Sequence, residues 1–389
     1  MLLYWLIIIP ALLLALASLL GERRRANYVL ARLDPRPAAM PPATVIVPVK
    51  GYEEGLAANL ASLAALDYPD FELIVTACAE EDVPPGVVPS NARLVLAGPP
   101  PPGTAEKIHN LLAAVRAARL SSVVFAFADS DGQVRPDWLR ALVAALEEPG
   151  AGAATGYRWH TPLRGGFWSL LRSVWNAVIA GGFGPGQNRF AWGGAMAICR
   201  ETFYSLRVSD FWIGTISDDY RLTEAVKRAG LRIVYAPAAL VASADHTSGG
   251  EFLAWIRRQM LITRFYAPGL WWLGLISHIF YCAAMGLSIG LAAQGSGLAL
   301  LALFVQLGAG MIKGRNRVRL AERALPAQAA WFRNYGWIHI WWTPLATWVW
   351  LYSFVASAFG RTLYWRGRSY RLTARKAPAH AQSMGEGVS

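Results

Sequence analysis

Two aspartates, Asp129 and Asp131, flank Ser130 directly after the apolar run SVVFAFA. Carboxylates held close together repel each other, and a bound divalent cation removes that cost. Magnesium or manganese accepts a few carboxylate oxygens and completes its octahedron with diphosphate oxygens and water. The same residue types also form a simple Asx turn at a strand end. The position after a predicted buried strand favours the metal interpretation, with Asp129 and Asp131 as ligands of Mg²⁺ or Mn²⁺.

Three further acids follow other predicted elements. Asp82, in AEEDVPPG just past a predicted strand, either accepts hydrogens from a nucleoside or belongs to a turn. Asp218 and Asp219 follow Ser217, a pattern typical of a helix N-terminus, where the helix dipole favours acids. A carboxylate at this place can also act as a general base toward a sugar-acceptor hydroxyl, whose pKa lies far above 7.

Basic residues and one histidine are candidates for contacts with a charged ligand. Lys107, in GTAEKIHNLLAA, either contacts a phosphate or is an exposed helix lysine. His246, in SADHTSGG, is a candidate third metal ligand or an ordinary loop residue. The amphipathic segment WIRRQMLITRFY (255–266) carries Arg258, and it either anchors at a membrane surface or covers a diphosphate with its polar face.

Short β-branched runs alternate with amphipathic segments between residues 42 and 265. The expected strands are 43–49, 71–77, 93–98 and 122–128, and the expected helices are 59–66, 107–118 and 137–148. This alternation predicts a mostly parallel sheet with helices on both faces. Ligands bind beyond the C-terminal strand ends of such sheets, where the acids lie. No GxGxxG follows the first strand and no Walker motif is present, which excludes dehydrogenase-like and P-loop binding.

Residues 1–20 are apolar and long enough to form an N-terminal transmembrane helix. GERRR follows this run, whereas a cleaved signal peptide carries its positive charge before the apolar residues. We therefore expect the N-terminus outside and the following domain in the cytoplasm.

The predicted C-terminal membrane region, 268–360, presents a topological conflict. Its candidate spans are 270–293, the shorter 298–312, and 337–359. The positive-inside rule places both basic stretches, 313–319 and 361–376, in the cytoplasm. Three full spans cannot satisfy both, so one is interfacial or re-entrant, or 331–359 folds back on itself. Residues 361–389 are predicted to form a basic cytoplasmic tail, partly disordered.

The composition supports a membrane protein. The 389 residues are 54% hydrophobic and include 17 tryptophans, a residue that favours the membrane–water interface. The net charge of +12 lies beside apolar segments, which favours an anionic membrane surface over nucleic acid as the partner. Cys78, Cys199 and Cys282 are far apart and indicate no zinc site.

Several stretches together resemble the family-2 inverting glycosyltransferases and, among them, the ceramide glucosyltransferase group. The matching stretches occur in the family's order and are VIVPVKG, NLASLAALDYPDFELIV, Asp82, EKIHNL, DSDGQVRPD, GGAMAICR and SDDY. The resemblance implies a GT-A type α/β domain over 42–265, flanked by transmembrane helices. It implies transfer of a hexose from a UDP-sugar to the hydroxyl of a membrane lipid, ceramide or diacylglycerol, with inversion, in a multi-pass protein of the bacterial inner membrane.

The resemblance also implies roles for individual residues. Asp82 would hold the nucleoside, and Asp129 and Asp131 the donor and its metal. Asp219 would be the general base, with Asp218 at the position of the acid that precedes it. Lys107 would be a further substrate-binding residue.

One motif departs from the family pattern. The family follows its base with Gln/Arg-x-x-Arg-Trp, and an alignment on the later Arg264 puts Ile256, Gln259 and Met260 at the Arg, Arg and Trp positions. Arg257, Arg258 and Gln259 are nearby and are candidates to take their place, and Arg258 and Gln259 are expected to bind substrate. Two alternatives are a processive polysaccharide synthase and a non-catalytic membrane scaffold with a decayed transferase domain. The synthase normally needs this motif intact and several spanning helices, so the departure counts against it, whereas the departure supports the scaffold.

Overall fold

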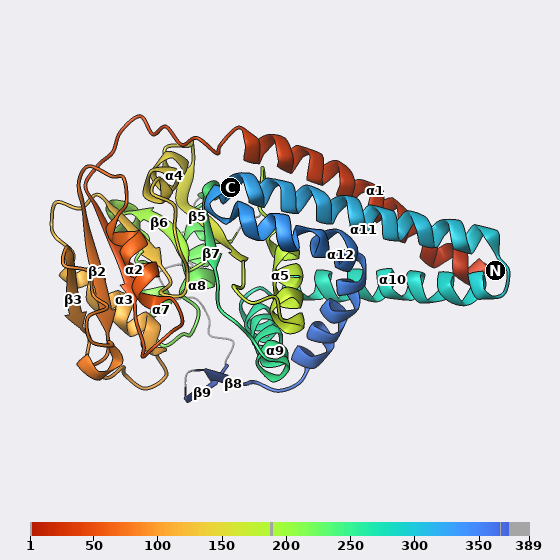
Figure 1. Ribbon diagram of the computed structural model, residues 1–389. Coiled ribbons are helices and arrows are strands. Elements are labelled where there is room, and N and C mark those ends of the chain that lie inside the picture. The colour runs from red at the N-terminus through yellow and green to blue at the C-terminus, as the bar shows by residue number, and fades with distance from the viewer. Residues whose placement is uncertain (1, 187–189, 366, 373–389) are drawn as a thin grey trace.

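A seven-stranded mixed sheet forms the centre of the protein, in a computed structural model that describes residues 2–186, 190–365 and 367–372. The strand order is β3-β2-β1-β4-β6-β5-β7 (Figure 1). The strands are β1 (Ala43–Pro48), β2 (Phe71–Ala77), β3 (Ala92–Leu96), β4 (Val124–Ala128), β5 (Ala151–His160), β6 (Ala195–Cys199) and β7 (Arg232–Ser243). The four predicted strands are therefore present as β1 to β4, and they pair in parallel.

The second half of the sheet reverses one strand. β6 pairs antiparallel with both β4 and β5, whereas β5 and β7 pair in parallel. β4 is buried along its whole length, as its apolar sequence VFAFA requires. The strand therefore delivers Asp129 to the edge of the sheet where the parallel strands β1 and β4 end.

Helices connect and follow the strands of this sheet. They are α2 (Leu56–Ala64), the 3₁₀ turn η1 (Glu80–Asp82), α3 (Glu106–Ala117), α4 (Trp138–Leu146), α5 (Phe167–Ala180), α6 (Arg200–Ser205), α7 (Val208–Trp212), α8 (Asp218–Arg228) and α9 (Gly249–Tyr266). One core lies under α2 and α4 and includes the fully buried Trp138. A second core lies under α3 and α8 on the other face and includes Trp212.

Three helices of the described residues are long and apolar enough to cross a membrane. They are α1 (Leu2–Leu30), α10 (Pro268–Ala293) and α11 (Gly297–Ala324). These helices project together from the α/β domain as an arm (Figure 1). α1 continues beyond residue 20, and its Glu22 pairs with Arg317 of α11 at 2.8 Å. The stretch 298–312 is thus part of a long helix that ends beside the domain, where Arg135 Nη1 donates to Ala324 O.

Helix α12 (Ala329–Ala358) leaves the α/β domain and returns to it. Its first half packs along α11, where Pro344 contacts Gly310. Proline inside a helix removes a backbone hydrogen bond and bends the axis. Pro344 lies inside α12, and this helix bends along its course (Figure 1). The second half runs back along α10, where Trp271 Nε1 donates to Ser357 Oγ at 2.9 Å. Both ends of α12 therefore lie on the domain side of the arm.

A β-hairpin follows α12. It comprises β8 (Thr362–Trp365) and β9 (Arg368–Arg371), which pair antiparallel. Arg368 Nε contacts Glu106 Oε2 at the start of α3 at 2.9 Å, so the hairpin is tied to the α/β domain. The first part of the predicted tail is thus ordered as a hairpin, and residues 373–389 lie outside the described residues.

Candidate active site

A cavity of about 640 Å³ lies beyond the ends of β1 and β4, between the α/β domain and α9. Seven of the eight predicted site residues line it, namely Lys107, Asp129, Asp131, Asp218, Asp219, Arg258 and Gln259. Asp82 is not among the lining residues. The hairpin also contributes to the wall, through Leu363, Tyr364 and Tyr370. The fold thus brings together acids and bases that are far apart in the chain.

The turn that holds Asp129 and Asp131 is fixed by α2 and the loop before it. The buried Ser130 donates its hydroxyl to Glu53 Oε2 at 2.5 Å, and its carbonyl accepts from Asn59 Nδ2 at 3.0 Å. These two contacts fix the position of Ser130, and Asp129, Ser130 and Asp131 all line the cavity wall.

Two buried cations neutralise this acidic turn. Lys107 Nζ lies 2.8 Å from Asp129 Oδ1 and 3.2 Å from Asp218 Oδ2. Arg158 of β5 donates from Nη1 to Asp131 Oδ2 at 2.9 Å, and from Nη2 to Asp131 Oδ1 at 2.6 Å and to Asp129 Oδ2 at 3.2 Å. Arg158 was missed in the sequence, although an arginine within the mostly apolar strand AGAATGYRWH signals a buried charge with a partner.

Burial and these cations shift the pKa values of the acids in different directions. Burial opposes ionisation of Asp129, but Lys107 and Arg158 outweigh it and keep the pKa of Asp129 below its ordinary value. Burial raises the pKa of Asp131 in spite of Arg158. Burial also raises the pKa of Asp218 to about 6, although Lys107 opposes the shift. Asp129 shares Lys107 with Asp218 and shares Arg158 with Asp131, so the protonation of one acid affects the others.

Two glycines allow this close arrangement of charges. A Cβ atom on Gly193 would lie within 3.0 Å of Asp218 Oδ2 and 2.9 Å from Lys107 Nζ. A Cβ atom on Gly194 would lie 2.7 Å from Asp129 Oδ2. The turn before β6 thus passes so close to the charged groups that a larger residue would push them apart.

Asp219 is held differently from its neighbour Asp218. Its Oδ1 accepts from the Ser217 hydroxyl at 2.5 Å and from the Tyr220 backbone N–H at 2.7 Å. Ser217 caps α8 as its sequence predicts, since its Oγ accepts from the same N–H at 3.3 Å. Neither contact of Asp219 brings a positive charge, and the residue lines the cavity. Its carboxylate is therefore oriented by neutral donors and can accept a proton.

The three arginines of α9 point to two different places. The helix starts with a capping box between Ser248 and Glu251. Arg257 Nε donates to Ala356 O at 3.2 Å, and Arg264 donates to Ser357 O, so both bind carbonyls at the end of α12. Arg258 lines the cavity, where burial and the nearby Arg158 lower its pKa to about 10. Of these arginines, Arg258 is therefore the one placed to meet a ligand.

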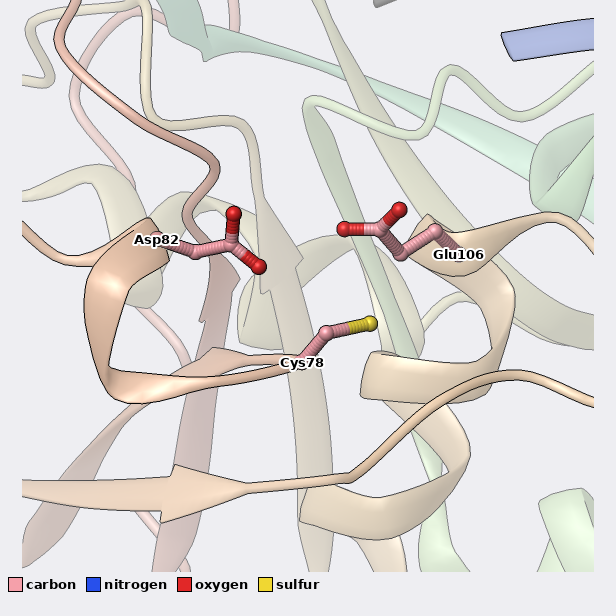
Figure 2. A group of neighbouring side chains, drawn as sticks. All are labelled: Cys78, Asp82 and Glu106. Carbon is pink, nitrogen blue, oxygen red and sulfur yellow. The ribbon is translucent and has the colours of Figure 1, made fainter.

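Asp82 lies in a separate polar cluster at the cavity's edge, with Cys78 and Glu106 (Figure 2). Their ligand atoms lie within 4.8 Å of one another, the one such group of three found among the described residues. Glu106 lines the cavity and also pairs with Lys50 and Arg368. Burial and Glu106 raise the pKa of the Cys78 thiol to about 12, which disfavours the thiolate that a soft metal needs. The cluster therefore suits hydrogen bonding better than metal binding.

His246 and its neighbour complete the far wall of the cavity. His246 lines the cavity but does not join Asp129 and Asp131 in a ligand group within the described chain. Asp245 pairs with Arg172 at 2.6 Å. The third-ligand interpretation of His246 therefore gains no support from its position.

Solved structures with similar folds include three at low sequence identity. A mannosyltransferase from Pyrobaculum calidifontis, in complex with GDP-Man and Mn²⁺, is 20% identical over 91% of this chain and 97% of its own, with a TM-score of 0.49. A mycobacterial protein is 20% identical over 62% of this chain and 78% of its own, with a TM-score of 0.39. Glucosyl-3-phosphoglycerate synthase from Mycobacterium tuberculosis, in complex with Mn²⁺, UDP and glucosyl-3-phosphoglycerate, is 19% identical over 59% and 80%, with a TM-score of 0.39.

A search of curated proteins gives no match. A family profile, however, covers almost the whole chain, residues 3–377, and is described as glycosyl transferase family 21. This match confirms the resemblance to the ceramide glucosyltransferase group and the predicted fold class, a GT-A type α/β domain with flanking helices apolar enough to span a membrane. The chain belongs to glycosyl transferase family 21.

Proposed function

We propose that the protein transfers a hexose from a UDP-sugar to the hydroxyl of a membrane lipid, ceramide or diacylglycerol, with inversion at the anomeric carbon. One observation carries the proposal. A single cavity contains the acidic turn, the candidate base and an arginine-bearing helix, and that helix leads directly into α10, a candidate membrane span. Such a site can meet a soluble donor and a lipid that stays in the bilayer.

Asp219 acts as the general base in this proposal. The acceptor oxygen forms a bond to the anomeric carbon, while the bond from that carbon to the diphosphate oxygen breaks and UDP leaves with the electron pair. The proton of the acceptor hydroxyl passes to a carboxylate oxygen of Asp219. Attack from the face opposite the leaving group inverts the anomeric carbon in one displacement. The neutral donors that orient Asp219 support this role, because they leave its charge available.

Asp129 and Asp131 hold a divalent cation, Mg²⁺ or Mn²⁺, together with the diphosphate. The fit is supported by Arg158 Nη2, which both carboxylates reach, so that they already converge on one positively charged group. Carboxylate oxygens are the ligands that these ions prefer. The ion, when bound, neutralises negative charge on the diphosphate as it leaves. Lys107, which pairs with Asp129, and Arg258 and Gln259 of α9 line the same cavity and contact the donor.

The nucleoside binds at the cavity's edge, beside Asp82. The carboxylates of Asp82 and Glu106 can accept hydrogen bonds from the N–H group of uracil or from ribose hydroxyls. The assignment is supported by Glu106, which lines the cavity, lies within 4.8 Å of the ligand atoms of Asp82 and Cys78, and pairs with Arg368 of the hairpin.

We further propose that the catalytic domain lies in the cytoplasm, at the bacterial inner membrane. α1, α10 and α11 cross the bilayer, and α12 enters it and returns. This arrangement is supported by the bend of α12 and by the contacts of both ends of α12 on the domain side. It satisfies the positive-inside rule for both basic stretches, 313–319 and 361–376.

The proposal is tested by expression in a host that lacks glycolipids, followed by mass spectrometry of the extracted lipids. A new hexosyl-ceramide or hexosyl-diacylglycerol is expected, and Asp219→Asn should lower its formation by about 10²-fold or more. Asp210→Asn, which alters an acid of α7 paired with Arg207 away from the cavity, is the matched control. Wild-type turnover by purified Asp219→Asn would remove the base assignment. Products with many sugars would favour a processive synthase, and no product from a well-folded protein supplied with both lipids would favour a scaffold.

A further inference from the structure

Every carboxylate oxygen of the acidic turn already has a cationic partner within the protein. Asp131 gives both oxygens to Arg158, and Asp129 gives one to Arg158 and the other to Lys107. The turn that is proposed to bind a metal is therefore closed by the chain's own cations in the absence of ligands.

The two cations differ in how they are held. Lys107 also contacts Asp218, so it keeps a carboxylate partner even when Asp129 is engaged elsewhere. Arg158 has both of its carboxylate partners within the acidic turn. Its Nε–H is buried without a hydrogen bond to any described residue, so its donors are not fully used.

Arg158 also lies where an incoming diphosphate would meet it. It lines the cavity, its side chain is only 11% exposed, and its guanidinium lies 4.9 Å from the centre of the Trp192 ring, which lines the same cavity. A guanidinium binds carboxylate and phosphate in the same planar, two-pronged geometry. A phosphate group can therefore replace Asp131 as its partner without loss of hydrogen bonds.

We propose that Arg158 is an internal cation that competes with the metal for Asp131, and that it turns to the diphosphate of the donor when the donor binds. This inference rests on the proposed function, because it takes the donor to be a nucleoside diphosphate sugar with a divalent ion. Arg158 is then a positioning residue that makes metal binding depend on the donor. The metal alone binds weakly, because its charge meets that of Arg158, and binds tightly once the nucleotide has drawn the guanidinium away.

The test measures Mn²⁺ binding to the purified full-length protein in detergent by electron paramagnetic resonance, without and with UDP. Arg158→Gln should bind Mn²⁺ alone at least about tenfold more tightly than the wild type, which is an ordinary size for coupling between two binding events. UDP should raise the Mn²⁺ affinity of the wild type strongly and that of Arg158→Gln much less. The affinity for UDP itself should fall in Arg158→Gln, so the two ligands respond in opposite directions.

Three variants serve as controls. Arg158→Lys keeps the charge, so its affinity for Mn²⁺ alone should stay close to that of the wild type. If Arg158→Gln does not fold, Arg158→Lys takes its place in the comparison of Mn²⁺ affinity with and without UDP. Arg140→Gln removes a surface charge paired with Asp67 and should change nothing. Asp131→Asn should abolish tight Mn²⁺ binding and thereby locate the ion.

Equal Mn²⁺ affinities of the wild type and Arg158→Gln, with binding still lost in Asp131→Asn, would overturn the role of Arg158. Absence of Mn²⁺ binding in every protein, with or without UDP, would overturn it together with the proposed metal. Neither the Mn²⁺ nor the UDP binding measurement needs an acceptor or sugar transfer. If the expected changes in affinity are found but no glycolipid product forms, the role of Arg158 is upheld and only the lipid acceptor is refuted.

Discussion

Replacement of Asp218 by asparagine should make the protein more stable at neutral pH while it impairs the site. The pKa of the buried carboxyl is about 6, against an ordinary value of 3.8. Between these values the folded protein holds a proton that the unfolded chain has lost, so stability falls as the pH rises from about 4 to about 6. A difference of this size corresponds to about 3 kcal/mol, at about 1.4 kcal/mol for each pKa unit. Asparagine has nearly the same shape and never ionises, so the variant avoids the loss of stability that ionisation of the buried carboxyl causes.

The assay is thermal unfolding of the detergent-solubilised protein from pH 4 to pH 8. The unfolding temperatures of wild type and Asp218→Asn should agree near pH 4 and separate by a few degrees above pH 6, with the variant higher. Asp210→Asn should follow the wild type at every pH. A variant that unfolds below the wild type at pH 7.5 would refute the reasoning, because it would mean that the ion pair with Lys107 stabilises more than burial costs.

Two further predictions concern the elements around the site. Gly314→Ala should lower the unfolding temperature, because a Cβ atom there would overlap the backbone oxygen of His339 in α12. Gly308→Ala, on the same helix with open space around it, should leave the unfolding temperature unchanged. Equal effects of the two substitutions would exclude a packing role for Gly314. Ser248→Ala removes the cap of α9 and should lower the free energy of unfolding by about 1 kcal/mol. The substitution should also weaken UDP binding, measured by calorimetry. Unchanged UDP binding would mean that the cap does not help to place Arg258.

The first half of the α/β domain could be predicted from the sequence almost residue by residue. β2 begins and ends at the predicted residues, 71 and 77, and the helix predicted at 107–118 is α3, Glu106–Ala117. Strands buried on both faces and helices with one apolar face have distinct periods, so local sequence is enough to identify them. The acids were found because they lie just past such strands or in the first turn of a helix.

The remaining features depend on contacts between distant segments. The insertion of β6 between β4 and β5 in the opposite direction has no local signature, because the pairing direction does not alter the apolar pattern of a short strand. The roles of Arg158 and Glu106 could not be predicted, because each depends on an ion pair with a residue far away in the chain. The return of α12 toward the α/β domain depends on its packing first against α11, where Pro344 lies close to Gly310, and then against α10, where Ser357 binds Trp271.

Because the hairpin follows α12 in the chain, the cavity wall is completed only after the membrane helices have been synthesised. Tyr364 and Tyr370 are among the last described residues, yet they form part of the cavity wall, and Arg368 contacts Glu106 near the start of α3. A nascent chain still on the ribosome therefore has its acids in place but an open wall until every membrane helix has been inserted. Helix α1, by contrast, begins at the far tip of the helical arm, so an affinity tag placed before it would be remote from this wall (Figure 1).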